Sequence, residues 1–186
     1  APSGGGPALI TFDNAITLAH EMGHALHGLL SDVTYESLGG TSVARDFVEF
    51  GSQIMENWMG EPEVLRQYAL HYETGEPLPD EYIQKLQDSG TFNQGFVTVE
   101  YVAASLLDMA WHLLEEPVEH DANEFEAAEM NRIGLIEEII PRYRSTYFNH
   151  IFSGGYSAGY YVYLWAEVLD KDAFQAFKET GDLFDR

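Results

Sequence analysis

Apolar side chains recur every three or four residues along most of this 186-residue chain. That spacing is typical of helices that bury one face. It predicts helices over residues 13–30, 45–59, 61–75, 80–88, 93–116, 124–140, 142–150, 156–169 and 172–180. Glycine and proline separate most of these segments, as expected at helix ends. We therefore predict a mainly α fold.

Two segments lack the helical spacing. Residues 1–10 are rich in glycine and proline and are expected to form an irregular lead-in. Residues 31–44 contain Gly39 and Gly40, and we expect a loop there with at most a short strand pair around residues 33–35. Neither chain end carries a boundary signal, so residues 1–186 are expected to be part of one larger domain whose beginning and extreme end lie outside this sequence.

The composition narrows the possible partners. The chain carries 31 acidic and 9 basic residues, for a net charge of −22, and a surface of that sign repels nucleic acid and anionic membranes. No apolar run approaches the roughly 18 residues of a membrane span, and no secretion signal is recognisable, so we predict a cytoplasmic location. Cysteine is absent, which excludes disulfides, thiolate metal ligands and a cysteine nucleophile.

The chemistry of the chain centres on His20-Glu21-Met22-Gly23-His24, within the helix predicted over residues 13–30. Residues four apart share a helix face, so His20 and His24 are placed to bind one metal ion. Glu21 lies between them, where a carboxylate reaches a water on that metal. The alternative is a plain helical bundle in which the two histidines share a face by chance.

A catalytic zinc usually has three protein ligands and one open position. The other histidines show no second close pair, so a carboxylate from the helix predicted over residues 45–59 is the natural third ligand. That helix carries Glu49 and Glu56 seven residues apart, on one face and among apolar neighbours. Acidic residues that share a helix face often simply face solvent. If the apolar neighbours bury these two, however, each carboxylate needs a cation or hydrogen-bond donors. We expect Glu49 to bind zinc and Glu56 to accept the free ring N–H of a ligand histidine.

Tyr156, Tyr160 and Tyr163 recur at spacings of four and three residues and are predicted to share a helix face. An aromatic packing stripe is the simpler interpretation. The alternative is a hydroxyl aimed at a developing oxyanion, since buried hydroxyls need a partner. Gly154-Gly155 comes just before, where small residues allow close approach to a ligand or movement around it, and His150 ends the preceding helix.

Residues 20–24 together with residues 40–58 resemble the zinc metallopeptidase family of thimet oligopeptidase, oligopeptidase A and peptidyl-dipeptidase, most of all its peptidyl-dipeptidase and thimet branches. In that family the third zinc ligand is a glutamate 25 residues after the second histidine, which is Glu49 here. Glu56 matches a supporting glutamate one heptad further on. This chain departs from the family pattern at Gly51, where proline is common, and at Met22, where phenylalanine is common.

Residues 150–165 resemble the same family, in which a flexible glycine loop and tyrosines line the substrate cleft. The resemblance implies that His150, Gly154-Gly155 and Tyr156 bind substrate. It also implies that the hydroxyls of Tyr160 and Tyr163 lie near the tetrahedral intermediate of the reaction.

The resemblance implies a multi-helix, zincin-type catalytic domain that binds one zinc ion and is a fragment of a larger two-lobed helical peptidase. It implies hydrolysis of peptide bonds in short oligopeptides, with Glu21 as the general base. The partner lobe would be an N-terminal part of the same protein that is missing here. Two points stay open: whether cleavage is internal or releases C-terminal dipeptides, and whether the chain is instead a zinc-stabilised helical module, inactive by itself, that needs the missing lobe or a partner.

Overall fold

The computed structural model describes residues 6–116 and 119–185. Helices dominate these residues, and no strand forms among them beyond a single bridge between Leu70 and Pro77, which confirms the mainly α prediction. The strand pair considered near residues 33–35 does not form, and a short 3-10 helix, η1, occupies Glu36–Leu38 instead. No helix in the two described ranges is both long enough and apolar enough to cross a bilayer.

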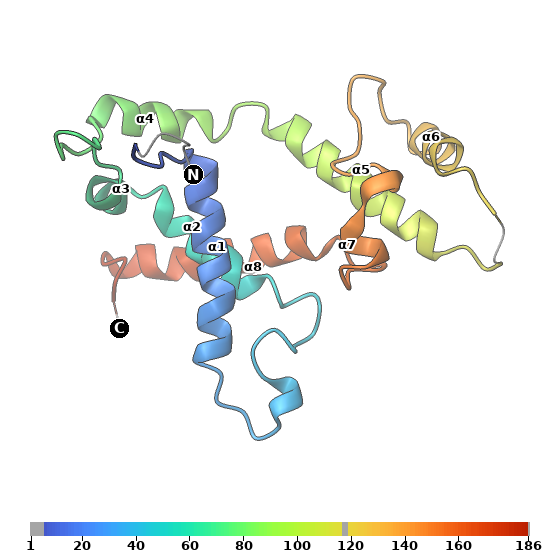
Figure 1. Cartoon of the computed structure of the whole chain (residues 1–186), viewed down its shortest axis with the longest axis horizontal. Coiled ribbons are helices and arrows are strands. Elements are labelled where there is room, and N and C mark those ends of the chain that lie inside the picture. The colour runs from blue at the N-terminus through green and yellow to red at the C-terminus, as the bar shows by residue number, and fades with distance from the viewer. Residues whose placement is uncertain (1–5, 117–118, 186) are drawn as a thin grey trace. The chain divides into compact units, whose positions relative to one another are not determined.

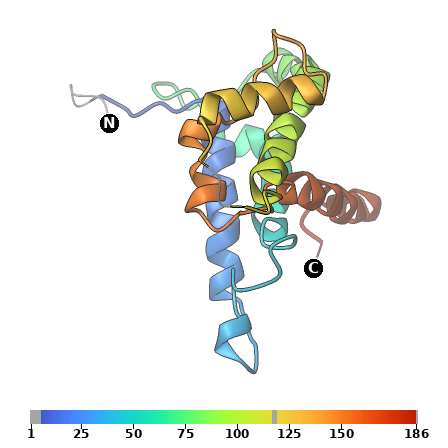
Figure 2. The same cartoon turned by 90° about the vertical axis from the view of Figure 1, so that its right-hand side faces the viewer.

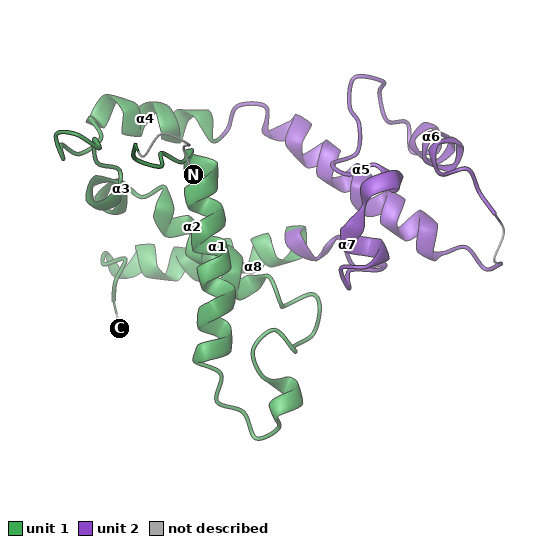
Figure 3. Ribbon diagram, in the orientation of Figure 1, with its two compact units in different colours: residues 1–90, 164–186 green, residues 91–163 purple. Residues whose placement is uncertain are grey.

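The chain forms two compact units, which Figure 3 shows in different colours. Unit 1 comprises residues 1–90 and 164–186, and unit 2 comprises residues 91–163. Unit 1 therefore joins the two terminal parts of the sequence, while unit 2 is one continuous stretch. Each unit has buried apolar residues of its own, such as Leu65 in unit 1 and Leu107 in unit 2.

The described helices of unit 1 are α1 (Phe12–Leu29), α2 (Phe50–Met59), α3 (Pro62–Tyr68), α4 (Asp80–Ser89) and most of α8 (Val162–Thr180). Helices α1 and α2 pack side by side (Figures 1 and 2). The Thr11 hydroxyl caps α1 by accepting the N–H of Asn14 at 3.2 Å. Asp13, where the predicted helix begins, therefore lies in the first turn of α1, where a carboxylate interacts favourably with the positive end of the helix dipole.

Helix α2 is shorter than its apolar spacing predicts. It begins at Phe50 rather than at residue 45, because the residues before it form tight turns, with the Phe47 N–H bonded to the Ala44 carbonyl at 2.9 Å. Glu49 is consequently the N-cap residue of α2 and does not lie inside the helix. Its backbone angles are nevertheless helical (φ −85°, ψ −8°), and its carbonyl accepts the Gln53 N–H at 2.9 Å. Glu49 and Glu56 both contact His20, as their spacing of seven residues predicts.

Helix α3 also ends early, at Tyr68 rather than near residue 75. The chain reverses direction after it, with the His71 N–H donating to the Glu76 carbonyl at 2.8 Å and the Leu78 N–H to the Ala69 carbonyl at 2.9 Å. These bonds use backbone groups that a longer helix would have paired along its own axis. Helix α4, by contrast, lies within one residue of its predicted range.

Helix α8 is one continuous helix, where the sequence predicted two, over residues 156–169 and 172–180. Residues 162–180 contain neither glycine nor proline, so nothing in this stretch breaks the helix. The residues just before it, 157–161, form turns. Within unit 1, Asn57 of α2 donates from Nδ2 to the buried carboxylate of Asp170 at 2.8 Å, which joins α8 to α2.

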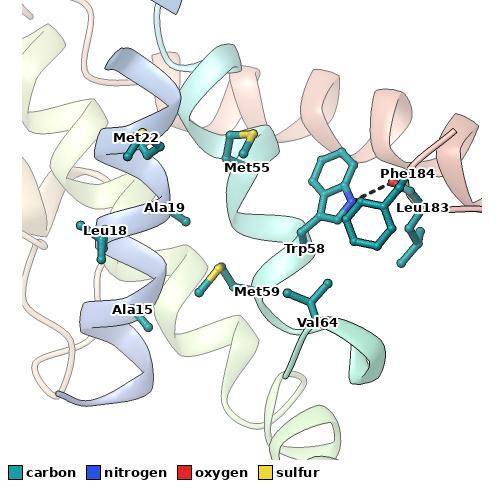
Figure 4. A pocket seen from close by; sticks show the side chains of 10 residues that line it. All are labelled: Ala15, Leu18, Ala19, Met22, Met55, Trp58, Met59, Val64, Leu183 and Phe184. Atoms are coloured by element: carbon teal, nitrogen blue, oxygen red, sulfur yellow. Dashed lines mark hydrogen bonds between the residues drawn. The ribbon is translucent and has the colours of Figure 1, made fainter. Parts of the chain in front are cut away.

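An apolar groove of about 500 Å³ opens on unit 1 (Figure 4). Side chains of α1, α2, α3 and the chain end line it: Ala15, Leu18, Ala19, Met22, Met55, Trp58, Met59, Val64, Leu183 and Phe184. The indole of Trp58 donates to the carbonyl of Leu183 at 2.9 Å and so holds the chain end against the groove. On α1 the groove residues lie on the face opposite to His20 and His24, given about 3.6 residues per turn. The groove and the histidine motif therefore use different faces of one helix.

Unit 2 contains α5 (Gln94–His112), α6 (Ala122–Arg132), η2 (Ser145–Tyr147) and the short α7 (Asn149–Phe152). Its buried core includes Ala104, Phe148, Ile151 and Tyr160. Helix α6 ends at Arg132 and not near residue 140, because the chain turns there and then returns to α5, where the Arg142 N–H donates to the Glu100 carbonyl at 3.0 Å.

Candidate metal centre

Helices α1 and α2 bring together a cluster of three side chains with metal-binding atoms. One carboxylate oxygen of Glu49, Oε2, lies 3.2 Å from Nε2 of His20 and 3.2 Å from Nε2 of His24. All three ligand atoms lie within 4.8 Å of one another. The two histidines meet because they are four residues apart on α1, and Glu49 joins them from the turn that starts α2. The sequence-predicted ligands thus converge on one point.

The surroundings of Glu49 suit a cation. Its side chain is 1% exposed, and a buried carboxylate is costly without a positive partner or donors. The Ser52 hydroxyl donates to Oε2 at 2.9 Å, and the two ring nitrogens face the same oxygen. Without a metal, those nitrogens need protons to make favourable contacts, whereas a divalent cation replaces the protons. Two imidazoles and a carboxylate, with no thiolate, form a ligand set that zinc accepts.

Glu56 fixes the orientation of the first histidine. Its Oε1 lies 2.6 Å from Nδ1 of His20, so Nδ1 carries the proton and Nε2 is directed at the cluster. Hydrogen bonds to Glu49 and then to Glu56 raise the pKa of His20 to about 9 in the metal-free chain. The same two carboxylates therefore favour a positive charge at this position, whether the charge is a proton or a metal ion.

Gly23 is a residue of this centre that the sequence reasoning did not single out. A Cβ atom at this position would lie 2.4 Å from the carbonyl oxygen of Gly51 and 2.6 Å from Cα of Ser52. No other residue type allows α1 and α2 to come this close, and that approach brings Glu49 to the histidines. In the sequence, Gly23 between the two histidines and Gly51 were the signals that could have indicated this close approach of the two helices. His27 lies beside Gly51, because a Cβ added to Gly51 would be 3.5 Å from Nδ1 of His27.

Glu21 is exposed on α1 and precedes His24 by three residues. Residues three apart are neighbours on a helix surface. Glu21 is not one of the three residues whose ligand atoms converge.

In unit 2 the predicted substrate-binding residues gather around Tyr160. The rings of Tyr163 and His150 lie 5.5 Å and 5.6 Å from that of Tyr160, and Tyr156 stacks on Tyr163 at 5.5 Å. They do not share a helix face as predicted, because Tyr156 and Tyr160 precede α8. The chain turns between them, with the Gly159 N–H donating to the Tyr156 carbonyl at 2.8 Å. Burial raises the pKa of the Tyr160 hydroxyl.

The glycine pair before these tyrosines is required by the path of the chain itself. A Cβ at Gly154 would lie 2.8 Å from Cα of His150, and the Gly154 N–H donates to the Asn149 carbonyl at 2.7 Å. Gly155 has a φ of +83°, which favours glycine. Gly154 therefore allows the chain to pass close to the first residues of α7.

The whole chain, residues 1–186, matches the model of peptidase family M3. The chain belongs to this family. It is 48% identical over 184 residues to a dipeptidyl carboxypeptidase of Escherichia coli (strain K12) and 42% identical over 191 residues to an oligopeptidase A of the same organism. It is also 34% identical over 164 residues to mitochondrial intermediate peptidase 1 of Cryptococcus neoformans. The resemblance read from residues 20–58 and 150–165 is thereby confirmed.

This family M3 chain spans about a quarter of the length of those relatives. The two alignments with the Escherichia coli enzymes cover 98% and 100% of this chain but 27% of each relative. The alignment with the Cryptococcus enzyme covers 88% of this chain and 21% of that relative. The cluster of His20, His24 and Glu49 lies in unit 1. The tyrosine group, which we define as His150, Tyr156, Tyr160 and Tyr163, lies in unit 2.

Proposed function

We propose that this chain carries the zinc-binding and catalytic residues for hydrolysis of peptide bonds in short oligopeptides. The observation that supports this most directly is the position of Glu49 Oε2, at 3.2 Å from Nε2 of both His20 and His24. A buried carboxylate between two imidazoles four residues apart on one helix is the ligand set of a catalytic zinc site. The relatives named above bear the names of peptidases.

His20, His24 and Glu49 would hold one zinc ion, which when bound acts as a Lewis acid and lowers the pKa of a water molecule to about 7. Glu56 keeps the proton of His20 on Nδ1, so that Nε2 remains a ligand. Ser52 holds the Glu49 carboxylate by its hydrogen bond to Oε2. The protein thus orients His20 and Glu49 through a second contact each.

Glu21 is the proposed general base. Its carboxylate takes a proton from the attacking water, whose oxygen bonds to the carbon of the scissile peptide. When the C–N bond breaks, Glu21 returns that proton to the leaving nitrogen, which departs as an amine. The step consumes one water and needs no other reactant.

The tyrosine group supplies donors and contact area for the peptide. We assign the hydroxyl of Tyr160 or Tyr163 to the oxyanion that forms on the carbonyl, because a donor at that point stabilises the transition state more than the bound substrate. His150, Gly154-Gly155 and Tyr156 are assigned to substrate binding, as in the family resemblance. The net charge of −22 opposes nucleic acid and anionic membranes as partners, and a cytoplasmic location stays a prediction.

A second candidate is a zinc-stabilised helical module without activity of its own. The observation that favours it is length, since the chain covers 27% of the dipeptidyl carboxypeptidase and of the oligopeptidase A. In that case the remaining polypeptide, or a partner chain, completes the site and selects between internal cleavage and dipeptide release.

The Glu21→Gln variant tests the proposed mechanism. We expect it to bind one zinc per chain, as the wild type does, and to lower kcat on a fluorogenic peptide by at least roughly a hundredfold, the usual contribution of a general base. Asp13→Asn is the matched control, because it removes an exposed carboxylate from the same helix about two turns before His20, and it should leave both values unchanged.

Zinc content is measured by elemental analysis, and turnover is measured with and without a chelator. Full activity in Glu21→Gln would refute its role as base. A wild-type chain that binds zinc but turns over no peptide would favour the inactive module, and a chain that binds no zinc would contradict both candidates.

A further inference from the structure

Side chains of α5 hold the backbone of residues 158–160 at three points. The Ala158 N–H donates to Oδ1 of Asp108 at 2.9 Å, and the Tyr160 N–H donates to Oδ2 of the same carboxylate at 2.8 Å. The hydroxyl of Tyr101 donates to the carbonyl of Tyr160. Two N–H groups and one carbonyl within three residues are therefore bonded to one helix and not to each other.

Asp108 is fully buried, and the proposed hydrolysis makes no use of it. A third donor reaches it from its own helix, since Nδ1 of His112 lies 2.8 Å from Oδ1. Two N–H groups and an imidazole therefore satisfy the carboxylate, as a buried charge requires. A side chain this costly to bury has a purpose in the fold or in the site.

The segment it holds is conformationally unusual. Ala158 has a φ of +52°, in the left-handed region that residues with a Cβ seldom adopt. Such a conformation persists only where surrounding contacts impose it. The bonds from Asp108 to Ala158 and Tyr160 lie on both sides of Gly159, so the carboxylate spans the turn that places Tyr160 ahead of α8.

The consequence is a fixed position for one aromatic ring. Tyr160 is 4% exposed, and its ring packs on Phe148 at 4.7 Å and on Tyr101 at 5.1 Å. Its N–H and its carbonyl are both held by α5, which leaves the direction of its Cα–Cβ bond little freedom. We infer that Asp108 is a positioning residue, whose two carboxylate oxygens set the backbone of residues 158–160 and thereby the place of the Tyr160 hydroxyl in the reaction. The kinetic part of this inference rests on the proposed function, but the structural part does not.

A carboxylate is needed at residue 108 because each of its two oxygens accepts a backbone hydrogen bond. The isosteric change Asp108→Asn keeps one acceptor and turns the other position into an amide N–H, which then faces the N–H of Ala158 or Tyr160. We expect the amide hydrogens of Ala158 and Tyr160 to exchange with solvent roughly ten- to a hundredfold faster in this variant, the loss that a buried donor without its acceptor produces.

Asp170→Asn is the matched control for amide exchange. Asp170 is a second buried aspartate, 1% exposed, but it lies on α8 in unit 1 and accepts from Asn57. The Asp170→Asn variant should leave the exchange rates of the amide hydrogens of Ala158 and Tyr160 unchanged. Equal acceleration at these two amides in both variants would show general destabilisation and would overturn the positioning role, as would unchanged exchange in Asp108→Asn.

Turnover of a fluorogenic peptide is the second readout. Tyr160→Phe should lower kcat by roughly a hundredfold, as the loss of one oxyanion donor does. Asp108→Asn should lower kcat roughly tenfold with little change in KM, and should change kcat by less than about twofold when Tyr160 is already phenylalanine, because residues that act through one group are not additive.

The two readouts separate the two possible failures. Additive losses in the double variant would show that Asp108 does not act through Tyr160 and would overturn the kinetic part of the inference. Full turnover in Tyr160→Phe would assign the oxyanion to Tyr163 and would also overturn the kinetic part of the inference. A wild-type chain without turnover would count against the proposed function, and amide exchange, which needs no turnover, would then decide the role of Asp108 by itself.

Discussion

At the residue scale, His20 couples the metal centre to pH. Its Nδ1 is held by Glu56 and its Nε2 faces Glu49, so both ring nitrogens meet carboxylate oxygens. These contacts raise its pKa from 6.5 to about 9 in the metal-free chain. The protonated ring therefore stabilises the metal-free fold fully below pH 6.5, and this contribution disappears as the pH rises through about 9. A metal ion competes with the same proton for Nε2.

Zinc affinity should consequently rise with pH. Because His20 must lose its proton to bind, we expect the dissociation constant to fall by about tenfold per pH unit up to about pH 9 and then to level off. Isothermal titration at constant ionic strength measures this. In Glu56→Gln the amide oxygen still accepts from Nδ1 but the charge is gone, so the levelling should begin at a lower pH. A flat profile between pH 7 and 9 in the wild type would contradict the assignment of His20 as a ligand.

At the element scale, the crossing of α1 and α2 decides the geometry of the site. The two helices meet where Gly23 faces the backbone of Gly51 and Ser52, with no room for a Cβ. Glu49 lies two residues before Gly51, so any separation of the helices at this crossing moves its carboxylate away from His20 and His24. The sequence spacing between the histidines and Glu49 therefore works only because the helices approach this closely.

Two glycines of α1 make a matched pair of substitutions. Gly23→Ala should force the helices apart, cost about 1–3 kcal/mol of stability as overpacking does, and weaken zinc binding by at least about tenfold. Gly28→Ala meets no atom within 4 Å and should stabilise α1 by about 0.5–1 kcal/mol, without effect on zinc. Urea unfolding and zinc titration measure both effects. Equal gains in stability from the two variants would show that the crossing is not tight.

At the scale of the whole molecule, the metal ligands all belong to one unit. The proposed ligands His20, His24 and Glu49 lie in unit 1, together with Glu56, which orients His20, and Ser52, which orients Glu49. Unit 2 carries the tyrosine group and its own buried core around Phe148. If these residues bind zinc as proposed, the binding free energy acts directly on unit 1 alone.

Zinc should protect the two units unequally. At a free concentration one hundred times the dissociation constant, zinc stabilises the state that binds it by about 2.7 kcal/mol. We expect slower amide exchange in α1 and α2 and unchanged exchange in α5 and α6. Exchange measured by mass spectrometry with and without zinc tests this, with His24→Ala as the control that should lose the protection. Equal protection of both units would show that they unfold as one.

Features set by residues close together in the sequence follow the sequence prediction, and features set by distant residues differ from it. Helix α4 is close to its prediction and α1 is displaced by about one residue, because a cap and an apolar stripe are local properties. Helices α2, α3 and α6 are shorter than predicted. In each case, backbone N–H and C=O groups that the pattern assigned to the helix form hydrogen bonds in turns or with another segment instead. The break predicted near residue 170 does not exist, and the three tyrosines gather through a turn and not along one helix face.

The sequence by itself determined the helical class, the family and the ligand spacing, because i and i+4 positions on a helix and a characteristic motif are readable along the chain. Only the tertiary structure decided that Glu49 reaches both histidines from a helix cap, that Gly23 permits this, and that Asp108 holds a backbone segment 50 residues away. These features depend on contacts between elements far apart in the sequence, and no periodicity within one element encodes them.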